Sequence, residues 1–322
     1  MQPSRRDVST LVFAAALGPL PARAQGHGPL VIARGGGAGE APDATRDAYD
    51  QAIRDGADFL EAELAVSKDG VLVARRDDEL STTTDIATRA EFSSRKAIKT
   101  IDGVERSGWF AEDFTLAELK TLICGPLGGR RGRGKTPPAI LTLQDVIEIA
   151  RAGCVRTGRV IGVYAALPHP AYFAGLNPAM EPRVAEAIRR GGYDALASAM
   201  IVTSRDPRAL KALARLTRVR RVLRLGSKTT VDLADARGSA HGVAPDLARI
   251  IDVSAPRRLA ATPFIGLAHA AGLVVHAWAA PSDPQALMEA AFAAGADGVS
   301  ADLAKPAVKA RAKTTTSENR ET

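Results

Sequence analysis

Two glutamates lie two residues apart in the stretch DFLEAEL, residues 58–64. In an extended strand such side chains point to the same face, so Glu61 and Glu63 should face one side together. Paired carboxylates supply the oxygen ligands that Mg²⁺ and Ca²⁺ prefer, which makes this strand a candidate metal site. The pattern is equally consistent with an internal salt bridge to Arg34 or Arg76, because a buried carboxylate needs a partner.

The loop RGGGAGEAPDAT, residues 34–45, is a second candidate site. It follows the apolar run Leu30–Ala33 and precedes a helix that should be capped near Thr45, so it would leave the carboxyl end of a buried strand. Such loops hold the chemistry of α/β proteins. This one contains no histidine, serine or cysteine, and its residues alone leave open whether it is an altered active site or a structural loop.

Two phosphate-binding patterns fail in their context. The stretch GRRGRGKT, residues 129–136, matches the G-x-x-x-x-G-K-[ST] pattern, but it runs into Pro137 and Pro138, which block the helix that a phosphate-binding loop must open. A solvated basic loop is the better interpretation. The glycines of residues 35–39 also fail as a dinucleotide fingerprint, because the required third glycine falls on Glu40.

The elements that must position these residues alternate along the chain. Apolar runs predict strands at Val31–Arg34, Asp58–Leu64, Val160–Ala165, Ala199–Ser204, Arg221–Leu225, Gly242–Pro245, Leu273–Ala279 and Gly298–Asp302. Helical patterns occur at Arg46–Arg54, Leu143–Arg151, Pro182–Arg190, Pro207–Leu216, Pro256–Ala271 and Pro284–Ala294. Eight strands with intervening helices predict a (β/α)8 TIM barrel of the α/β class.

One long segment interrupts this alternation. Residues 77–138 exceed a barrel loop and read as an insertion after the second strand, which itself returns through an Asp69-Gly70 turn. Within the insertion, FTLAELKTL (residues 114–122) predicts a helix whose Thr115 and Glu118 form a capping box.

Six blocks in this order resemble the glycerophosphodiester phosphodiesterases, closest to the periplasmic bacterial type. They are IARGGGAGEAPDAT, GADFLEAELAVSKDGVLVARRDDELSTTTD, FTLAELKTL, IGVYAALPHPAYF, LVVHAWAAPSD and GADGVSADLAKPAV, and they span residues 30–308. The resemblance implies a (β/α)8 barrel with an insertion after the second strand. It also implies hydrolysis of glycerophosphodiesters to glycerol 3-phosphate and an alcohol, with Ca²⁺ or Mg²⁺ and two histidines.

The chain departs from that family at the positions that matter most. The family histidines fall on Arg34 and Arg76, and the arginine after the first histidine falls on Gly35. The metal pair Glu-x-Asp becomes Glu61-x-Glu63, and the third metal carboxylate falls on Ala166. Arginine stays protonated and cannot act as a general base. A site that lacks one carboxylate of three should bind Ca²⁺ or Mg²⁺ weakly.

Two functions follow from these departures. The first is a catalytically impaired family member that binds a small phosphodiester or another phosphate-bearing anion through Arg34, Arg76, the amide of Gly36 and Trp278. The alternative is a working metal-dependent phosphodiesterase that uses Glu61, Glu63 and Asp43 with a rearranged acid–base pair. His169 and His276 are expected to be structural in either case.

The ends of the chain suggest export. Residues 1–24 combine Ser4-Arg5-Arg6, a short apolar stretch and an Ala22-x-Ala24 cleavage pattern, which predicts a twin-arginine signal, a mature chain from residue 25 and a periplasmic or secreted location. The apolar stretch is too short for a membrane span. The tail, residues 309–322, is polar and without apolar periodicity, so it is expected to be disordered.

The charge and the cysteines add two constraints. Of the net charge of +7, residues 1–24 carry +2 and residues 305–322 carry +3, so the body carries only +2 and does not suit nucleic-acid binding. Cys124 and Cys154 would meet oxidising conditions after export, and both a disulfide and two free thiols remain open. The sequence does not indicate an oligomeric state.

Overall fold

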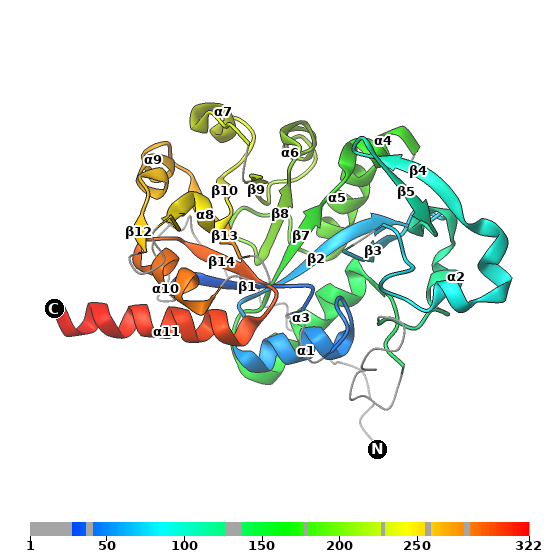
Figure 1. The fold of residues 1–322 in the computed structure, drawn as a ribbon, viewed down its shortest axis with the longest axis horizontal. Helices are drawn as coiled ribbons and strands as arrows, with labels where there is room; N and C mark the ends of the chain where they lie inside the picture. Colours follow the sequence, from blue (N-terminus) through cyan, green and yellow to red (C-terminus); the bar gives the residue numbers. More distant parts are fainter. Residues whose placement is uncertain are drawn as a thin grey trace, which may run out of the picture.

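Eight parallel strands close into a barrel in the computed structural model, which describes residues 28–36, 41–76, 78–125, 137–176, 179–226, 229–254, 259–279 and 284–321 (Figure 1). The strands follow the order β1-β14-β13-β10-β9-β8-β7-β2, and pairing of β1 with β2 closes the ring. They are β1 (Leu30–Arg34), β2 (Phe59–Val66), β7 (Gly162–Leu167), β8 (Met200–Ser204), β9 (Arg220–Arg224), β10 (Gly242–Ala244), β13 (Val274–Trp278) and β14 (Gly298–Ala301).

Each predicted strand overlaps one strand of this barrel, so the predicted fold class is confirmed. The apolar runs are buried on both faces, as parallel strands under helices require. The barrel interior holds Ile32, Phe59, Tyr164, Ile201, Val222 and Ala244. Two larger clusters of buried apolar side chains lie between the strands and the surrounding helices.

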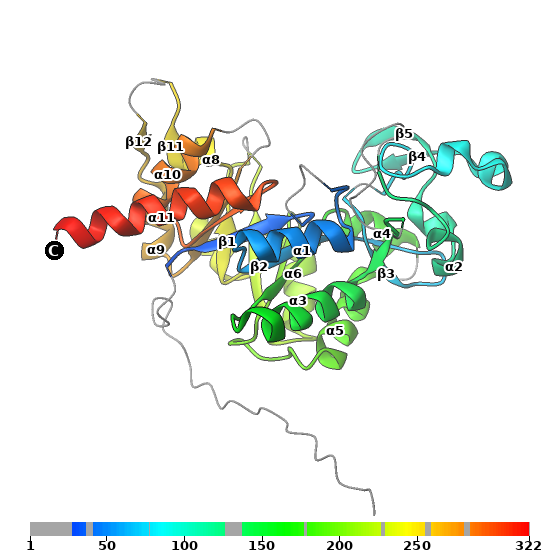
Figure 2. The same cartoon turned by 90° about the horizontal axis from the view of Figure 1, so that it is seen from below.

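Helices cover the outside of the barrel (Figure 2). They are α1 (Arg46–Asp55), α3 (Leu143–Thr157), α4 (Pro170–Leu176), α5 (Met180–Arg190), α6 (Pro207–Ala214), α7 (Leu233–Arg237), α8 (Leu247–Ile250), α9 (Phe264–Ala270), α10 (Gln285–Ala293) and α11 (Ala304–Glu321). Thr45 caps α1 as predicted, with its side chain accepting from the Ala48 amide, and Gly56 ends that helix in the left-handed conformation. None of the helices in the described residues is long and apolar enough to cross a membrane.

One prediction outside the barrel strands was wrong. The helix predicted at Pro256–Ala271 begins only at Phe264, and before it β12 (Ala260–Ala261) pairs antiparallel with β11 (Ile251–Asp252). Pro263 explains the late start, since proline lacks an amide hydrogen and is tolerated only at the beginning of a helix.

The last helix of the structure runs into the polar tail, whose expected disorder stays a prediction. Helix α11 continues through Glu321. Its first turns are anchored because Ala307 and Ala310 are buried and Arg311 forms an ion pair with Asp58. This anchoring depends on buried alanines at helical spacing, which are difficult to recognise in a segment that is otherwise polar.

The insertion after the second strand forms a lobe at the end of the molecule opposite α11 (Figures 1 and 2). Its described elements include the hairpin β4 (Ala97–Ile101) and β5 (Val104–Gly108) and the helix α2 (Leu116–Leu119). On either side of it in the sequence, β3 (Leu72–Ala74) and β6 (Leu141–Thr142) pair with each other and extend the sheet from β2. The predicted capping box of Thr115 and Glu118 is present, although α2 is shorter than the predicted 114–122. The lobe shares the buried cluster that packs on β2, because Leu80, Phe92 and Phe114 belong to it.

The hairpin tip of the insertion reaches back to the barrel. Asp102 and Gly103 both have positive φ (50° and 79°), which is the backbone of the tightest hairpin turns. The Asp102 Oδ2 atom lies 2.6 Å from Nδ1 of His169, which follows β7. This contact places the insertion beside the carboxyl ends of the barrel strands.

Cys124 and Cys154 are both free in the structure. The buried Cys124 thiol accepts from Arg75 Nη1 at 3.3 Å, whereas the Cys154 thiol contacts the backbone of Ile161. The stretch 129–136, the signal segment 1–24 and residues 37–40 of the first loop lie outside the described residues.

Candidate functional site

The predicted site residues meet at the carboxyl ends of the strands. Arg34 is the last residue of β1 and is in register with Glu61 on β2. Two residues further, Glu63 is in register with Ala166 on β7. Trp278 ends β13, on the other side of Arg34. The structure therefore brings together residues up to 244 positions apart in the sequence.

The two glutamates share a cation that the sequence analysis missed. Arg224, the last residue of β9, directs Nη1 to Glu61 Oε1 at 3.3 Å and to Glu63 Oε1 at 3.2 Å. The other Glu61 oxygen accepts from Ser300 Oγ at 2.5 Å. Glu61 is 1% exposed, and Arg224 is nearly as deep, with 12% of its side chain exposed. The internal salt bridge is thus present, with Arg224 as its main cation.

The arginines at the two family histidine positions are tied to acids as well. Arg34 is 4% exposed and contacts Asp302 through Nε at 2.5 Å and the Ala279 carbonyl oxygen through Nη2 at 3.0 Å. Arg76 is 36% exposed and lies 3.2 Å from Asp43, 3.3 Å from Asp302 and 3.6 Å from Glu63. Asp302, directly after β14, therefore bridges the two arginines.

We call this set the ion-pair network. Its cations are Arg34, Arg76 and Arg224, and its anions are Asp43, Glu61, Glu63 and Asp302. Three guanidinium groups against four carboxylates leave at most one negative charge uncompensated. The Trp278 ring lies beside the network, 5.9 Å from the Arg34 guanidinium carbon and 5.5 Å from that of Arg224. Its indole N–H donates to the Leu225 carbonyl oxygen at 3.2 Å, which fixes the ring.

Burial shifts the acid–base properties of two carboxylates in the network. The pKa of Glu63 is raised by burial and then by the charge of Glu61, against the opposing effects of Arg224 and Arg76. The pKa of Asp43 is also raised, by burial first, although Arg76 opposes the shift. One Asp43 oxygen, Oδ1, is buried without a hydrogen-bond partner among the described residues.

The carboxylates do not fit a divalent cation as they stand. Both glutamates already contact the Arg224 guanidinium, and Ala166, at the third carboxylate position, offers no side-chain oxygen. Among the described residues, no group of three or more acids, histidines or cysteines is arranged to hold a metal ion. A cation such as Ca²⁺ needs at least six oxygen ligands. It would also have to displace a guanidinium that the protein itself supplies.

The first two glycines of the loop after β1 have structural roles. Gly36 adopts φ 86°, and a Cβ there would lie 2.7 Å from the Tyr49 nitrogen, so only glycine lets the loop approach α1. The amide of Gly36 donates to the Ala33 carbonyl oxygen and that of Gly35 to the Glu61 carbonyl oxygen. Both amides thus donate within the protein, and the anion-binding role expected for Gly36 stays a prediction.

The two histidines considered in the sequence analysis lie in different surroundings. His276 is buried inside the barrel with Nδ1 3.4 Å from the Tyr164 hydroxyl, and burial lowers its pKa to about 4. His169 contacts Asp102 on the insertion hairpin, and its Nε2 lies 3.7 Å from Asp78. Neither contacts a member of the ion-pair network through a hydrogen bond or ion pair among the described residues.

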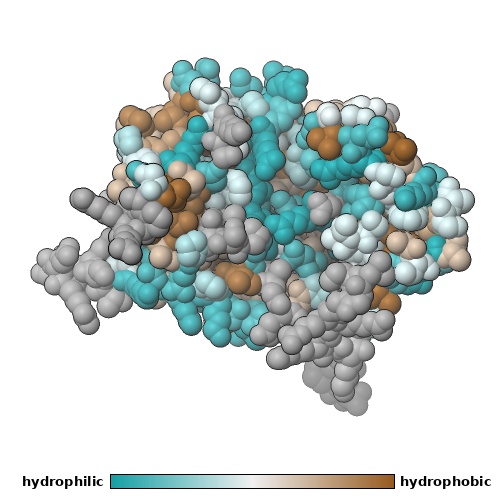
Figure 3. Space-filling view, in the orientation of Figure 1, coloured by the Kyte–Doolittle hydropathy of each residue, from teal (hydrophilic) through white to brown (hydrophobic). Residues whose placement is uncertain are grey.

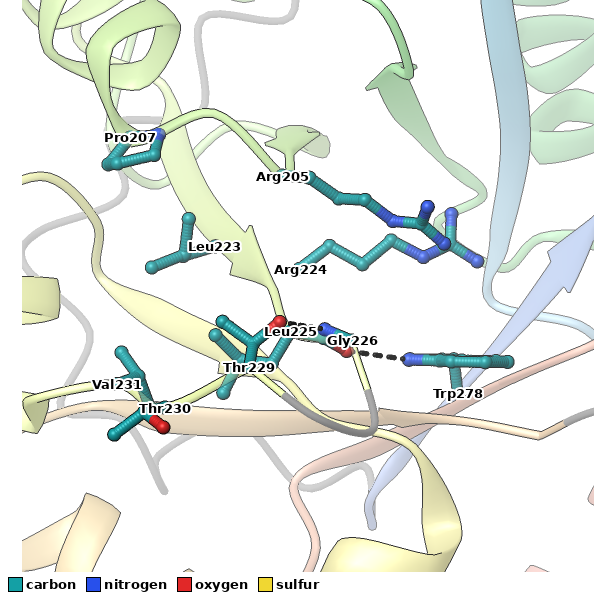
Figure 4. A pocket seen from close by; sticks show the side chains of 10 residues that line it. All are labelled: Arg205, Pro207, Leu223, Arg224, Leu225, Gly226, Thr229, Thr230, Val231 and Trp278. Carbon is teal, nitrogen blue, oxygen red and sulfur yellow. Dashed lines mark hydrogen bonds between the residues drawn. The ribbon is translucent and has the colours of Figure 1, made fainter. Parts of the chain in front are cut away.

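A pocket adjoins the network on the side of β8, β9 and β13. Its volume is about 470 Å³, and Arg205 and Arg224 extend side by side along one wall above Trp278 (Figure 4). In the space-filling view, hydrophilic side chains form a band across the middle of the molecule (Figure 3). Arg205 directly follows β8, and an arginine directly after an apolar strand was the signal that could have found it.

Comparison with known proteins identifies the family to which this barrel belongs. Residues 34–305 match the Glycerophosphoryl diester phosphodiesterase family. The chain belongs to this family. Its relatives hydrolyse glycerophosphodiesters, and the family is generally dependent on a divalent metal ion. The match runs from the last residue of β1 through β14, and it includes the insertion and every residue of the ion-pair network.

Individual relatives agree with this assignment. A glycerophosphodiester phosphodiesterase from Arabidopsis thaliana is 29% identical over 80% of this chain and 76% of its own length. One from Haemophilus influenzae is 26% identical over 57% of this chain and 51% of its own length.

Solved structures share the fold. The glycerophosphodiester phosphodiesterase from Agrobacterium tumefaciens superimposes with a TM-score of 0.62 at 20% identity, covering 88% of this chain and 100% of that one. A phosphodiesterase from Oleispira antarctica, solved with its product sn-glycerol-3-phosphate, has a TM-score of 0.63 at 21% identity and covers 88% and 96% of the two chains.

Proposed function

We propose that this chain is an exported, catalytically impaired member of the family whose barrel mouth binds a small phosphate-bearing ligand. The observation that carries the proposal is the Arg224 guanidinium held against Glu61 and Glu63. In an active member of the family these acids would face Ca²⁺ or Mg²⁺. Here they pair with a cation that is part of the chain, so a divalent ion should bind weakly.

Proton transfer is impaired for a separate reason. Arg34 and Arg76 stand where the family has histidines, and both form ion pairs with the carboxylates around them. Arginine neither accepts nor releases a proton in the useful pH range. General acid–base assistance contributes roughly 10²–10⁴-fold to a reaction of this kind. Loss of that assistance and of the metal together should leave hydrolysis far below ordinary enzyme rates.

Ligand binding is supported by the arginines that line the mouth. Arg76 is partly exposed, and the adjoining pocket presents Arg205 and Arg224. Guanidinium groups suit phosphate oxygens because they donate two parallel hydrogen bonds. The sn-glycerol-3-phosphate complex of the Oleispira relative supports a ligand of this class. A contact to Arg34 stays a prediction, and it would require the Arg34–Asp302 pair to open.

One observation favours the alternative, a working phosphodiesterase with a rearranged acid–base pair. Asp43 has a raised pKa, a buried oxygen without a partner among the described residues, and Arg76 as its neighbour. A carboxyl of this kind can hold a proton at higher pH than usual and could serve as an acid. The alternative would then use Asp43 together with Glu61 and Glu63.

A hydrolysis assay separates the two functions. Glycerophosphocholine is incubated with the mature protein in Ca²⁺, in Mg²⁺ and in a chelator, and glycerol 3-phosphate is measured. We expect turnover well below ~1 s⁻¹, an ordinary enzyme rate, in every condition. Calorimetry without metal should meanwhile detect binding of glycerol 3-phosphate that weakens as salt rises. Turnover near 1 s⁻¹ that Asp43→Asn abolishes would establish the alternative.

Export through the twin-arginine route is part of the same proposal. The support is Arg5-Arg6 ahead of a short apolar stretch and the Ala-x-Ala pattern. Replacement of Arg5 and Arg6 by lysine should leave the uncleaved precursor in the cytoplasm, as judged by fractionation and immunoblotting. Unchanged delivery of a cleaved chain would reject this route, whereas the proposed ligand binding would be unaffected.

A further inference from the structure

The pocket beside the ion-pair network is built differently on its two sides. Arg205 and Arg224 form one wall, and the Trp278 ring lies below them (Figure 4). Leu223 and Val231 supply apolar surface on the opposite side, where Thr229 and Thr230 also line the pocket (Figure 4). A volume of about 470 Å³ is in the range of small-molecule sites.

Arg205 forms no ion pair with a carboxylate of the described residues. Among the described residues it has neither a hydrogen-bond partner nor a carboxylate within ion-pair distance, in contrast to all three cations of the network. Its pKa is lowered by burial and then by the nearby charge of Arg224, whereas the charges of Glu63 and Asp102 oppose the shift. Two guanidinium groups side by side repel each other, and an anion between them would turn that repulsion into two attractions.

Arg224, in the same wall, has a hydrogen-bond donor that no described residue accepts from. Its Nη1 serves both glutamates, whereas its Nε is buried without a partner among the described residues. A buried N–H group without a partner is unfavourable, and a ligand oxygen that reaches it would supply the missing acceptor. Because the glutamates lie behind Arg224, they hold its guanidinium in place beside the pocket.

We propose that this pocket binds a phosphate monoester that carries a small apolar group. The phosphate lies between Arg205 and Arg224, and the apolar group lies on the Leu223 and Val231 side. This inference rests on the proposed function, which it deepens by naming the ligand class and the residues that select it. It also moves the main anion contact from Arg34 and Arg76 to Arg205 and Arg224.

Calorimetry with three probes tests the assignment at low and high salt. The probes are inorganic phosphate, glycerol 3-phosphate and phenyl phosphate. Phenyl phosphate should bind most tightly, because only it places an apolar group on the apolar wall. Arg205→Ala should weaken its binding roughly 10- to 100-fold, the range expected for loss of charged hydrogen bonds. The affinity of Arg205→Lys for phenyl phosphate should lie between those of Arg205→Ala and the unmodified protein. Lysine keeps the positive charge but cannot donate the two parallel hydrogen bonds of a guanidinium group.

Arg208→Ala is the matched control. Arg208 lies three residues away, is 82% exposed and pairs with Asp206, outside the pocket. The Arg208→Ala variant should bind phenyl phosphate with the same affinity as the unmodified protein. Thermal unfolding of each variant checks that the fold is kept, which is expected because Arg205 makes no hydrogen bond or ion pair with the described residues.

The outcomes separate this inference from the proposed function. If the probes bind equally well to Arg205→Ala while Arg76→Ala abolishes binding, the pocket assignment is overturned and the proposed function stands. If phenyl phosphate binds no more tightly than inorganic phosphate, the apolar selection is overturned. If the unmodified protein binds none of the probes, both the pocket and the ligand-binding part of the proposed function fail.

Discussion

Replacing Arg224 with alanine is expected to destabilise the protein by about 3–5 kcal/mol, the usual cost of breaking a buried ion pair from one side. The guanidinium contacts both Glu61 and Glu63, and Glu61 is almost fully buried. Removal of the cation leaves two carboxylates facing each other in a region from which water is largely excluded. Urea unfolding at neutral pH, compared with the exposed control Arg208→Ala, measures the loss.

Two further measurements identify repulsion between carboxylates as the cause. Substitution of Glu61 and Glu63 by glutamine in the Arg224→Ala background should recover most of the lost stability. The deficit should also be larger at pH 8 than at pH 5. Burial and the Glu61 charge raise the pKa of Glu63, so the folded state holds that proton more tightly than the unfolded chain. Protonated Glu63 therefore favours the folded state at low pH, and this contribution is lost as the pH rises through the pKa that Glu63 has in the folded protein. A loss that is the same at both pH values, and is not recovered by glutamine, would contradict this account.

The barrel could be predicted from the sequence because its strands are short apolar runs bounded by turn residues. The run at Val31–Arg34 fell on β1 and the run at Gly298–Asp302 fell on β14, although these two strands are adjacent only after the barrel closes. Periodicity reports which residues are buried, and burial on both faces is what parallel strands share. The misplaced start of α9 and the helical tail have local causes, a proline at position 263 and buried alanines in a polar helix.

The candidate site was predictable only in part. Glu61 and Glu63 were found because strand geometry alone sets them on one face. Arg224 was missed because it lies 161 residues beyond Glu63, and an arginine at a strand end carries no local sign of its partner. Asp302 was missed for the same reason, since its partners Arg34 and Arg76 lie more than 220 residues away. These ion pairs form between strands that meet only when the barrel closes. A single sequence does not indicate which charged residues will then be neighbours.

The ion-pair network also explains why simple reversion should fail. Gly35 adopts φ 60°, and a Cβ there would lie 3.1 Å from Asp43. Gly35→Arg would therefore cost on the order of 1–2 kcal/mol in backbone strain and would crowd an acid of the network. We expect Arg34→His, Arg76→His and Gly35→Arg together to give no metal-dependent hydrolysis, because Ala166 still supplies no ligand and Arg224 still engages both glutamates.

A four-residue exchange that keeps Gly35 is expected to produce the activity that this chain lacks. It combines Arg34→His, Arg76→His, Ala166→Glu and Arg224→Leu. The exchange removes all three cations of the network and adds a carboxylate beside Glu63, with which position 166 is in register. Five carboxylates without an internal cation should destabilise the fold unless a divalent cation binds among them. Thermal unfolding should therefore shift upward with Ca²⁺ and downward with a chelator, an effect the unmodified protein should not show.

Hydrolysis of glycerophosphocholine should accompany that Ca²⁺ dependence. We expect at least ~10²-fold more glycerol 3-phosphate than the matched variant that lacks Ala166→Glu, because cation and acid–base groups act as a unit and their effects are non-additive. If the matched variant is as active as the full exchange, the missing carboxylate at position 166 does not limit the reaction. If the exchange variant is stabilised by Ca²⁺ and yet hydrolyses nothing, the metal site was rebuilt and the proton-transfer positions were assigned to the wrong residues. Asp43, with its raised pKa and its unpartnered oxygen among the described residues, would then be the next carboxyl to replace.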